Sequence, residues 1–211
     1  MARPSTPLLS RERIRAAALE MIDESGLAEL TMRSLAKRLG VQAPSLYSHY
    51  PTKEELLEDV ANQVIDKVDY SGLEGDDWRA GLASWARSYR AALRAHPNIV
   101  PLIAYGPGRR EEMLRRADAV HGCLVRAGWP PRIATMIGAS VKYLVVGAGI
   151  SSFARGFSDD AALYADRYPH LRQAYLLPEF AQEIDEESFE LSLNALLDGL
   201  TRHPAAPRTR S

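Results

Sequence analysis

Residues 31–53 place the strongest constraint on how this chain can fold. Apolar residues recur there at helical spacing on both sides of Gly40, so we expect two short helices joined at that glycine. The segment contains no Asp or Glu, although the whole chain has a formal net charge of only −1. Its charged residues are all basic: Arg33, Lys37, Arg38 and Lys53. An acid-free, cationic pair of helices is suited to contact phosphate groups.

The composition of the chain is that of an ordinary globular protein. Its 211 residues suffice for one large or two small domains, and 46% of them are hydrophobic and 25% charged. Cys123 is the single cysteine, so no disulfide can form within the chain. Residues 1–10 lack an apolar run of signal-peptide length. We therefore expect a cytoplasmic protein.

The most apolar run, residues 136–153, raises the question of a membrane span. It contains Lys142 together with several glycines and serines. It is also shorter than the ~20 apolar residues that a span requires. We interpret it as a buried helix and expect no membrane partner.

Periodicity predicts an all-α fold, since almost everything between Ser10 and His203 repeats at helical rather than alternating spacing. Helices are expected over residues 11–25, 32–39, 42–50, 52–68, 78–95, 98–105, 109–127, 130–156 and 183–202. Residues 158–178 are expected to be irregular. Two glycines and three aspartates in residues 69–77 mark a domain boundary. The predicted domains are residues 10–68 and 76–203, with flexible tails at 1–9 and 204–211.

The two helices around Gly40 have the properties of a helix-turn-helix, whose second helix lies in the major groove of DNA. Close approach to base edges requires short residues near the start of that helix, and Ser45 and Ser48 meet this requirement. Gln42 can pair with adenine through its amide, and Arg33 is a second candidate for a base contact. The alternative is a generic helical hairpin with a solvated basic face.

Residues 10–65 also resemble the DNA-binding domain of TetR-family transcriptional repressors. The resemblance is carried by the sequences LTMRSLA at residues 30–36, SLYSHY at 45–50 and KEELL at 53–57. It implies a first helix that buttresses a helix-turn-helix, and a fourth helix that leads into a second domain. The implied fold is all-α, with an N-terminal three-helix DNA-binding domain and a C-terminal helical bundle for ligand binding and dimerisation.

By position, the resemblance implies which residues touch DNA. They are Thr31, Arg33, Gln42, Ala43, Pro44, Ser45, Tyr47, His49 and Lys53. Tyr47 and His49 correspond to typical phosphate contacts, whereas the base sequence is read by residues 42–45 and by Arg33. Further positive charge comes from the N-terminal arm and the first helix, in Arg3, Arg11, Arg13 and Arg15.

Residues 85–97 resemble the start of the ligand domain in the tetracycline-repressor-like branch of the family. Those repressors hold a magnesium-chelated drug with a histidine that follows this stretch, and residues 98–104 here contain none. We therefore expect neither tetracycline nor a metal or other cofactor. The candidate pocket residues are Trp85, Tyr89, Ile103, Tyr105, Met113, Met136, Lys142 and Tyr143. Ordinary core packing is the alternative for each, and Lys142 has the further options of an ion pair, the surface or an anionic effector.

Two helices are suited to dimerisation as a four-helix bundle across a two-fold axis. One offers small and apolar residues, and the other has more leucine than one side of a small domain needs. The candidate interface residues are Gly138, Val146, Gly147, Ile150, Phe189, Leu193, Leu197 and Leu200.

No arrangement of residues indicates catalysis. The histidines are scattered through the chain, and no metal-ligand or nucleophile–base spacing occurs. We therefore expect no enzyme. We expect a ligand-responsive, homodimeric repressor that a small, mostly apolar effector releases from a near-palindromic operator in double-stranded DNA. Two alternatives stay open: an activator or ligand-independent regulator on the same fold, and a helical carrier module that does not bind DNA.

Overall fold

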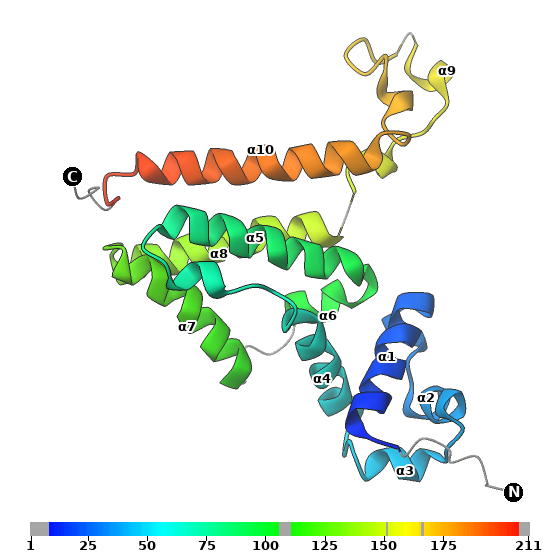
Figure 1. The fold of residues 1–211 in the computed structure, drawn as a ribbon. Coiled ribbons are helices and arrows are strands. Elements are labelled where there is room, and N and C mark those ends of the chain that lie inside the picture. Colours follow the sequence, from blue (N-terminus) through cyan, green and yellow to red (C-terminus); the bar gives the residue numbers. More distant parts are fainter. Residues whose placement is uncertain (1–8, 106–110, 151, 166, 207–211) are drawn as a thin grey trace, which may run out of the picture. The chain divides into compact units, whose positions relative to one another are not determined.

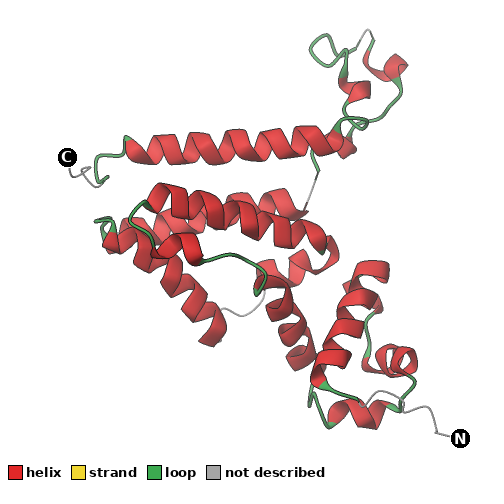
Figure 2. Cartoon of the chain, viewed as in Figure 1, coloured by secondary structure: helices red, strands yellow, loops and turns green. Residues whose placement is uncertain are grey.

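The structure is a computed structural model that describes residues 9–105, 111–150, 152–165 and 167–206. Within these residues every regular element is a helix and no strand occurs (Figures 1 and 2). The predicted all-α fold is therefore confirmed. The chain divides into two compact units, one made of Met1–Val68 and Ala91–Glu112 and the other of Asp69–Arg90 and Met113–Ser211. We call them the first and the second unit.

The first unit begins with four α-helices and a short 3-10 turn. They are α1 (Arg11–Ser25), η1 (Leu27–Glu29), α2 (Met32–Leu39), α3 (Ala43–Tyr47) and α4 (Lys53–Ile65). The bounds of α1 and α2 are as predicted, because each helix has a side-chain cap at its start and a glycine of positive φ at its end. α3 is shorter than predicted. After Tyr47 the backbone turns, and the N–H groups of His49 and Tyr50 both donate to the carbonyl of Leu46 at 2.9 Å.

The turn between α2 and α3 depends on one glycine and one capping pair. Gly40 has φ 69° and ψ 29°, in the left-handed region that favours glycine. The Thr31 hydroxyl accepts from the backbone N–H of Ser34 at 3.0 Å, and the Ser34 hydroxyl accepts from the backbone N–H of Thr31 at 2.9 Å. This reciprocal capping box fixes the start of α2.

The core of the first unit is formed by the predicted apolar faces. Its fully buried side chains include Ile14, Ile22, Leu35, Leu46, Leu56 and Val60. They recur at helical spacing on α1, α2, α3 and α4, so each of these helices buries one face against the others. The opposite faces of α2 and α3 stay exposed.

The segment after α5 (Trp78–Ala95) packs with the first unit. It contains η3 (Pro97–Ile99) and α6 (Val100–Tyr105), which contact α1 and α4, respectively. The Asn98 amide donates to the carbonyls of Ile22 and Asp23 at 3.0 Å each, and His96 Nδ1 lies 2.8 Å from Asp23 Oδ2. The sequence-based boundaries placed all of residues 76–203 in the second domain, because nothing local marks this contact.

The second unit consists of helices of very different length. They are η2 (Ser71–Glu74), most of α5, α7 (Glu111–Arg126), α8 (Pro131–Ile150), η4 (Ala154–Gly156), α9 (Ala161–Tyr164), η5 (Ala174–Leu176) and α10 (Ala181–Thr201). α8 ends six residues before the predicted position, and the predicted irregular segment before α10 contains only short helical pieces. Cys123 on α7 is buried, and burial raises the pKa of its thiol.

Two glycines allow η2 to approach α5 closely. A Cβ atom on Gly81 would lie 2.5 Å from the carbonyl oxygen of Gly72, closer than any side chain tolerates. Glycine at position 81 therefore has a packing role inside α5 that outweighs its low helix propensity.

α10 runs alongside α5 (Figure 1), and ion pairs join the two helices along much of their length. Arg87 pairs with Glu190 through bonds of 2.7 and 2.8 Å. The buried Arg90 donates to the carbonyl of Asp185 and pairs with Glu186, at 2.8 Å each. Arg79 forms a third ion pair with Asp198.

α8 is the one helix of the described residues that is long and apolar enough, by length and composition, to cross a membrane. We predicted it to be buried, and this is correct for one side only. Ala134, Ile137, Val141, Val145 and Gly149 face the core. The other side of α8 is exposed and also carries apolar residues, which do not pack within this chain.

Candidate nucleic-acid interface

The exposed face of α3 brings together the residues that were predicted to read bases. Gln42 is the N-cap residue of α3, but its side chain makes no capping hydrogen bond. Pro44 and Ser45 follow on the exposed face, and the Tyr47 side chain is 49% exposed. Leu46 and Tyr50 occupy the opposite, fully buried face. The amide of Gln42, the hydroxyl of Ser45 and the phenol of Tyr47 are therefore exposed, while the opposite face of the helix packs in the core.

The cations of the helix pair fall into two groups. Arg33 and Lys37 are exposed on α2, and neither has an ion-pair partner in the described part of the chain. Arg38, in contrast, bonds to Glu24 at 2.6 and 2.7 Å and to Glu20 at 3.2 Å. These bonds raise the pKa of Arg38 and lower the pKa of Glu24. Arg38 thus joins α2 to α1, so it contributes less to the free positive charge than the sequence indicated.

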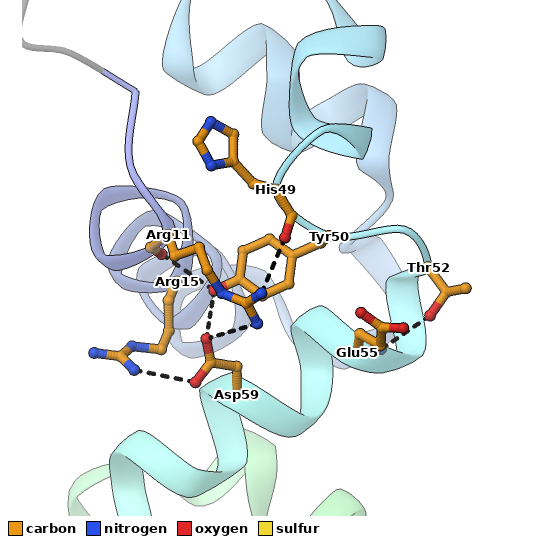
Figure 3. Close-up of polar contacts among 7 residues, drawn as sticks. All are labelled: Arg11, Arg15, His49, Tyr50, Thr52, Glu55 and Asp59. Atoms are coloured by element: carbon orange, nitrogen blue, oxygen red, sulfur yellow. Dashed lines mark hydrogen bonds and ion pairs between the residues drawn. The ribbon is translucent and has the colours of Figure 1, made fainter.

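The remaining predicted DNA contacts lie around this face. Ala43 and His49 are half-buried, and Lys53 is the first residue of α4, where backbone N–H groups also favour an anion. The Thr31 hydroxyl is exposed but engaged in capping α2. Thr52 caps α4 in the same way, accepting from the N–H of Glu55 at 3.1 Å (Figure 3). Arg3 lies outside the described residues.

A cluster around Asp59 of α4 was not anticipated from the sequence (Figure 3). The Tyr50 hydroxyl donates to Asp59 Oδ2 at 2.5 Å, and Arg15 Nη1 donates to Oδ1 at 3.1 Å. Arg11 Nη2 lies 3.6 Å from Oδ2, and its guanidinium sits 4.2 Å from the centroid of the Tyr50 ring. Arg11 also donates to the backbone carbonyl of His49 at 3.2 Å. We name these four side chains, Arg11, Arg15, Tyr50 and Asp59, the Asp59 cluster.

Electrostatics within the Asp59 cluster favour a charged carboxylate and a neutral phenol. Burial raises the pKa of Asp59, but hydrogen bonds from Tyr50 and Arg15 and the two guanidinium charges outweigh it and hold the pKa below its usual value. Burial and the bond to Asp59 raise the pKa of Tyr50 to about 12. Sequence spacing gave no signal for this cluster, because Arg15 and Asp59 are 44 residues apart.

The predicted pocket residues do not gather in one place. Trp85 and Tyr89 are buried one turn apart on α5, with ring centroids 5.9 Å apart. Met113 and Lys142 are half-buried in the second unit, and Lys142 has no ion pair within the described residues. Met136 and Tyr143 are exposed on the outer side of α8, so they do not line an interior. Ile103 is buried in the first unit, and the side chain of Tyr105 lies outside the described residues.

Trp85 has the property expected of a ligand contact. Its indole N–H is buried and has no acceptor within the described residues. Burial, with the neighbouring Tyr70 next in effect, raises the pKa of Tyr89 to about 12, so this phenol stays neutral. No group of three or more His, Cys, Asp or Glu side chains in the described ranges could hold a metal.

The predicted dimer residues lie on two different sides of their helices. Phe189, Leu193 and Leu197 are buried within the subunit, and Gly138 faces α7, where a Cβ atom on this glycine would lie 3.4 Å from Val120. Val146 and Leu200 are half-buried, whereas Gly147 and Ile150 are exposed. Sequence reasoning missed Leu191, which is 73% exposed on α10. Four-residue spacing alone did not separate the two faces of a helix this rich in leucine.

A helix-turn-helix with an exposed polar face, followed by a second helical unit, is typical of DNA-binding regulators. Residues 14–60 match the family described as bacterial regulatory proteins, tetR family. Residues 71–203 match the tetracyclin repressor-like C-terminal domain. The chain belongs to the TetR family and is a DNA-binding transcriptional regulator.

Individual relatives agree with this assignment. The tetracycline repressor protein class A from transposon 1721 of Escherichia coli is 33% identical over 88% of each chain. A possible TetR family transcriptional regulator from Streptomyces coelicolor A3(2) has a solved structure with a TM-score of 0.74 and 34% identity, covering 90% of this chain and 98% of that one. A variant of TetR from Acinetobacter baumannii AYE, in complex with minocycline, has a TM-score of 0.69 and 27% identity, covering 92% and 98%.

Proposed function

We propose that this regulator is a homodimeric repressor of the cytoplasm that a small, mostly apolar effector releases from a near-palindromic operator. The observation that carries the proposal is that the second helix of the helix-turn-helix, α3, exposes Gln42, Ser45 and Tyr47 on one face. Two such faces in a symmetric dimer suit successive major grooves of a palindromic site. That a relative of this chain is named a tetracycline repressor supports repression.

The dimer is proposed to form through the outer sides of α8 and α10. Met136, Tyr143 and Ile150 recur every seven residues and are all exposed, and Leu191 is exposed on α10. A Cβ atom on Gly147 would meet no other atom within 4 Å, so a second helix has room to approach there. These residues replace Gly138, Phe189, Leu193 and Leu197 in our proposal, because those four already pack within the subunit.

The effector is proposed to contact the second unit at Trp85 and Tyr89. A buried N–H without an acceptor is costly, and a ligand oxygen that accepted from it would recover that cost. We therefore propose a mostly apolar ring compound with an acceptor at one edge. Minocycline in a related structure supports a ring compound as a class, while the absence of histidine from residues 98–104 argues against metal-chelated tetracycline itself.

Operator binding is tested with genomic fragments from near the gene of this protein, in fluorescence anisotropy at rising salt. We expect one fragment to be bound at least about 1,000-fold more tightly than shuffled DNA. Binding that stays weak and indifferent to sequence would contradict the proposal and favour a carrier module. Transcription from that fragment in vitro separates repression from activation.

The effector is tested by screening ring compounds for release of the bound fragment. Trp85→Phe keeps an aromatic ring but removes the N–H group, so we expect the effector concentration for half release to rise roughly tenfold. Trp129→Phe is the matched control, because Trp129 Nε1 is also buried without a partner in the described residues but lies in the connection between α7 and α8. Equal losses in both variants would remove Trp85 from the effector site.

A further inference from the structure

The orientation of α3, a very short helix, depends on the contacts at its two ends. α3 has five residues, too few to be stable alone. Its start is fixed by α2 and Gly40, and its end runs through residues 48–50 into the cluster around Asp59. Contacts at that end must set the direction in which Gln42 and Tyr47 point.

We infer that Asp59 is a positioning residue for operator recognition, acting through Tyr50 and Arg11 on the end of the recognition helix. Asp59 is on α4, and its two oxygens accept hydrogen bonds from Tyr50, three residues after the end of α3, and from Arg15 on α1. Arg11 closes the arrangement by donating to the His49 carbonyl while stacking on Tyr50 (Figure 3). Two helices and the segment that follows α3 thus meet at one carboxylate, beside two proposed phosphate contacts.

The charge of Asp59 supports a role beyond ordinary packing. A carboxylate near a cationic DNA-binding surface repels phosphate groups, so it lowers the affinity for DNA of any sequence. It also holds Arg11 and Arg15, whose guanidinium groups would otherwise attract any DNA sequence. The cluster therefore favours the specific complex over the nonspecific one. It orients the exposed face of α3, and it pairs two arginines that would otherwise bind DNA of any sequence.

The test compares wild type and Asp59→Asn on a labelled operator duplex and on a shuffled duplex of equal length. The amide keeps the shape of the side chain but loses the charge that holds both arginines. We expect operator affinity to fall roughly tenfold, while affinity for shuffled DNA stays equal or rises. Tyr50→Phe keeps the ring but loses the hydroxyl contacts to Asp59 and to the Arg11 carbonyl, and it is expected to lower the ratio of the two affinities in the same direction.

Glu24→Gln is the matched control, because it removes another carboxylate that holds an arginine in the same unit but does not touch residues 48–50. We expect this variant to retain the wild-type ratio of operator to shuffled affinity, because Glu20 still pairs with Arg38. If Asp59→Asn lowers both affinities equally, or leaves their ratio unchanged, Asp59 has only a structural role and the inference is wrong. A wild type that does not discriminate between the duplexes overturns this inference together with the proposed function.

Thermal melting separates positioning from unfolding. The low pKa of Asp59 means that its carboxylate stabilises the fold above its unfolded value of 3.8, and that this contribution is lost as the pH falls through the lower folded value. We expect the difference in melting temperature between wild type and Asp59→Asn to be full at about pH 6 and to shrink below about pH 4. A difference independent of pH would show that the charge has no part in the cluster. Should Asp59→Asn fail to fold, Tyr50→Phe carries the affinity test.

Discussion

Two tyrosines near the end of the recognition helix have opposite surroundings. Tyr47 is 49% exposed and faces outward, whereas Tyr50 is fully buried and donates to Asp59. The residue type alone does not distinguish them, but their spacing does: positions 46 and 50 are one helical turn apart and face the core together. Tyr47 is left on the exposed side, which we propose contacts DNA.

We predict that Tyr47→Ala weakens operator binding about tenfold, because a phosphate contact and its aromatic support are lost. The salt dependence of binding should keep its slope, since no charge is removed. Anisotropy titrations at several salt concentrations measure both quantities, and gel filtration checks that the oligomeric state is unchanged. Unaltered affinity would exclude Tyr47 from the interface.

The exposed residues of α2 and α3 could be predicted from the sequence, but the ion pairs that they form could not. Arg33 and Arg38 look equivalent in an acid-free stretch, and only the fold brings Glu24 to Arg38. The Asp59 cluster could not be predicted for the same reason, since its members are far apart along the chain. Local patterns identify which side chains face outward, whereas three-dimensional packing decides which charges are neutralised.

At the scale of elements, the segment after α5 is joined to α1 by specific hydrogen bonds. The Asn98 amide donates to the carbonyls of Ile22 and Asp23 at the C-terminal end of α1, and the Ile22 carbonyl also accepts from the backbone N–H of Gly26. His96 adds a contact to Asp23, and its Nε2 lies 3.3 Å from Lys67 Nζ at the end of α4. The ends of three segments are therefore held together within the first unit.

We predict that Asn98→Ala destabilises the first unit by about 1–3 kcal/mol, because the Asp23 carbonyl loses the Asn98 donor and the Ile22 carbonyl keeps only the N–H of Gly26. Urea denaturation followed by circular dichroism measures the change. Gln42→Ala serves as the control, since the Gln42 side chain is exposed and makes no capping bond. If the two variants unfold at the same urea concentration, Asn98 does not stabilise the end of α1.

Most helices could be predicted from periodicity and capping residues, and α1, α2 and α5 have the expected bounds. The bounds of α3 and α8 differ from the predicted ones. α3 ends early because a turn satisfies the backbone of residues 49 and 50, and α8 ends before the predicted position at Gly156. The association of residues 91–112 with the first unit depends on contacts distant in sequence, which no local pattern carries.

At the scale of the whole molecule, the proposed dimer separates two kinds of leucine on α10. Leu197 is buried against its own subunit, whereas Leu191 is 73% exposed. Only an exposed residue can contribute a new surface to a partner copy, because a buried one is already committed to the core.

We therefore predict that Leu191→Glu yields a folded monomer, since it places a charge in the apolar contact between copies. Leu197→Glu should instead unfold the second unit, because an unpaired charge in the core is not tolerated. Sedimentation velocity measures the mass of each variant, and circular dichroism measures its helix content. A Leu191→Glu variant that stays dimeric would remove this side of α10 from the interface.

The buried thiol of Cys123 can report local unfolding of the second unit. It is the single cysteine of the sequence, and it lies in the second unit. A thiol reagent reacts with it only when that unit opens, while openings confined to the first unit leave no label. Labelling rates measured with and without effector or DNA therefore give the opening equilibrium of one half of the molecule, with no substitution introduced.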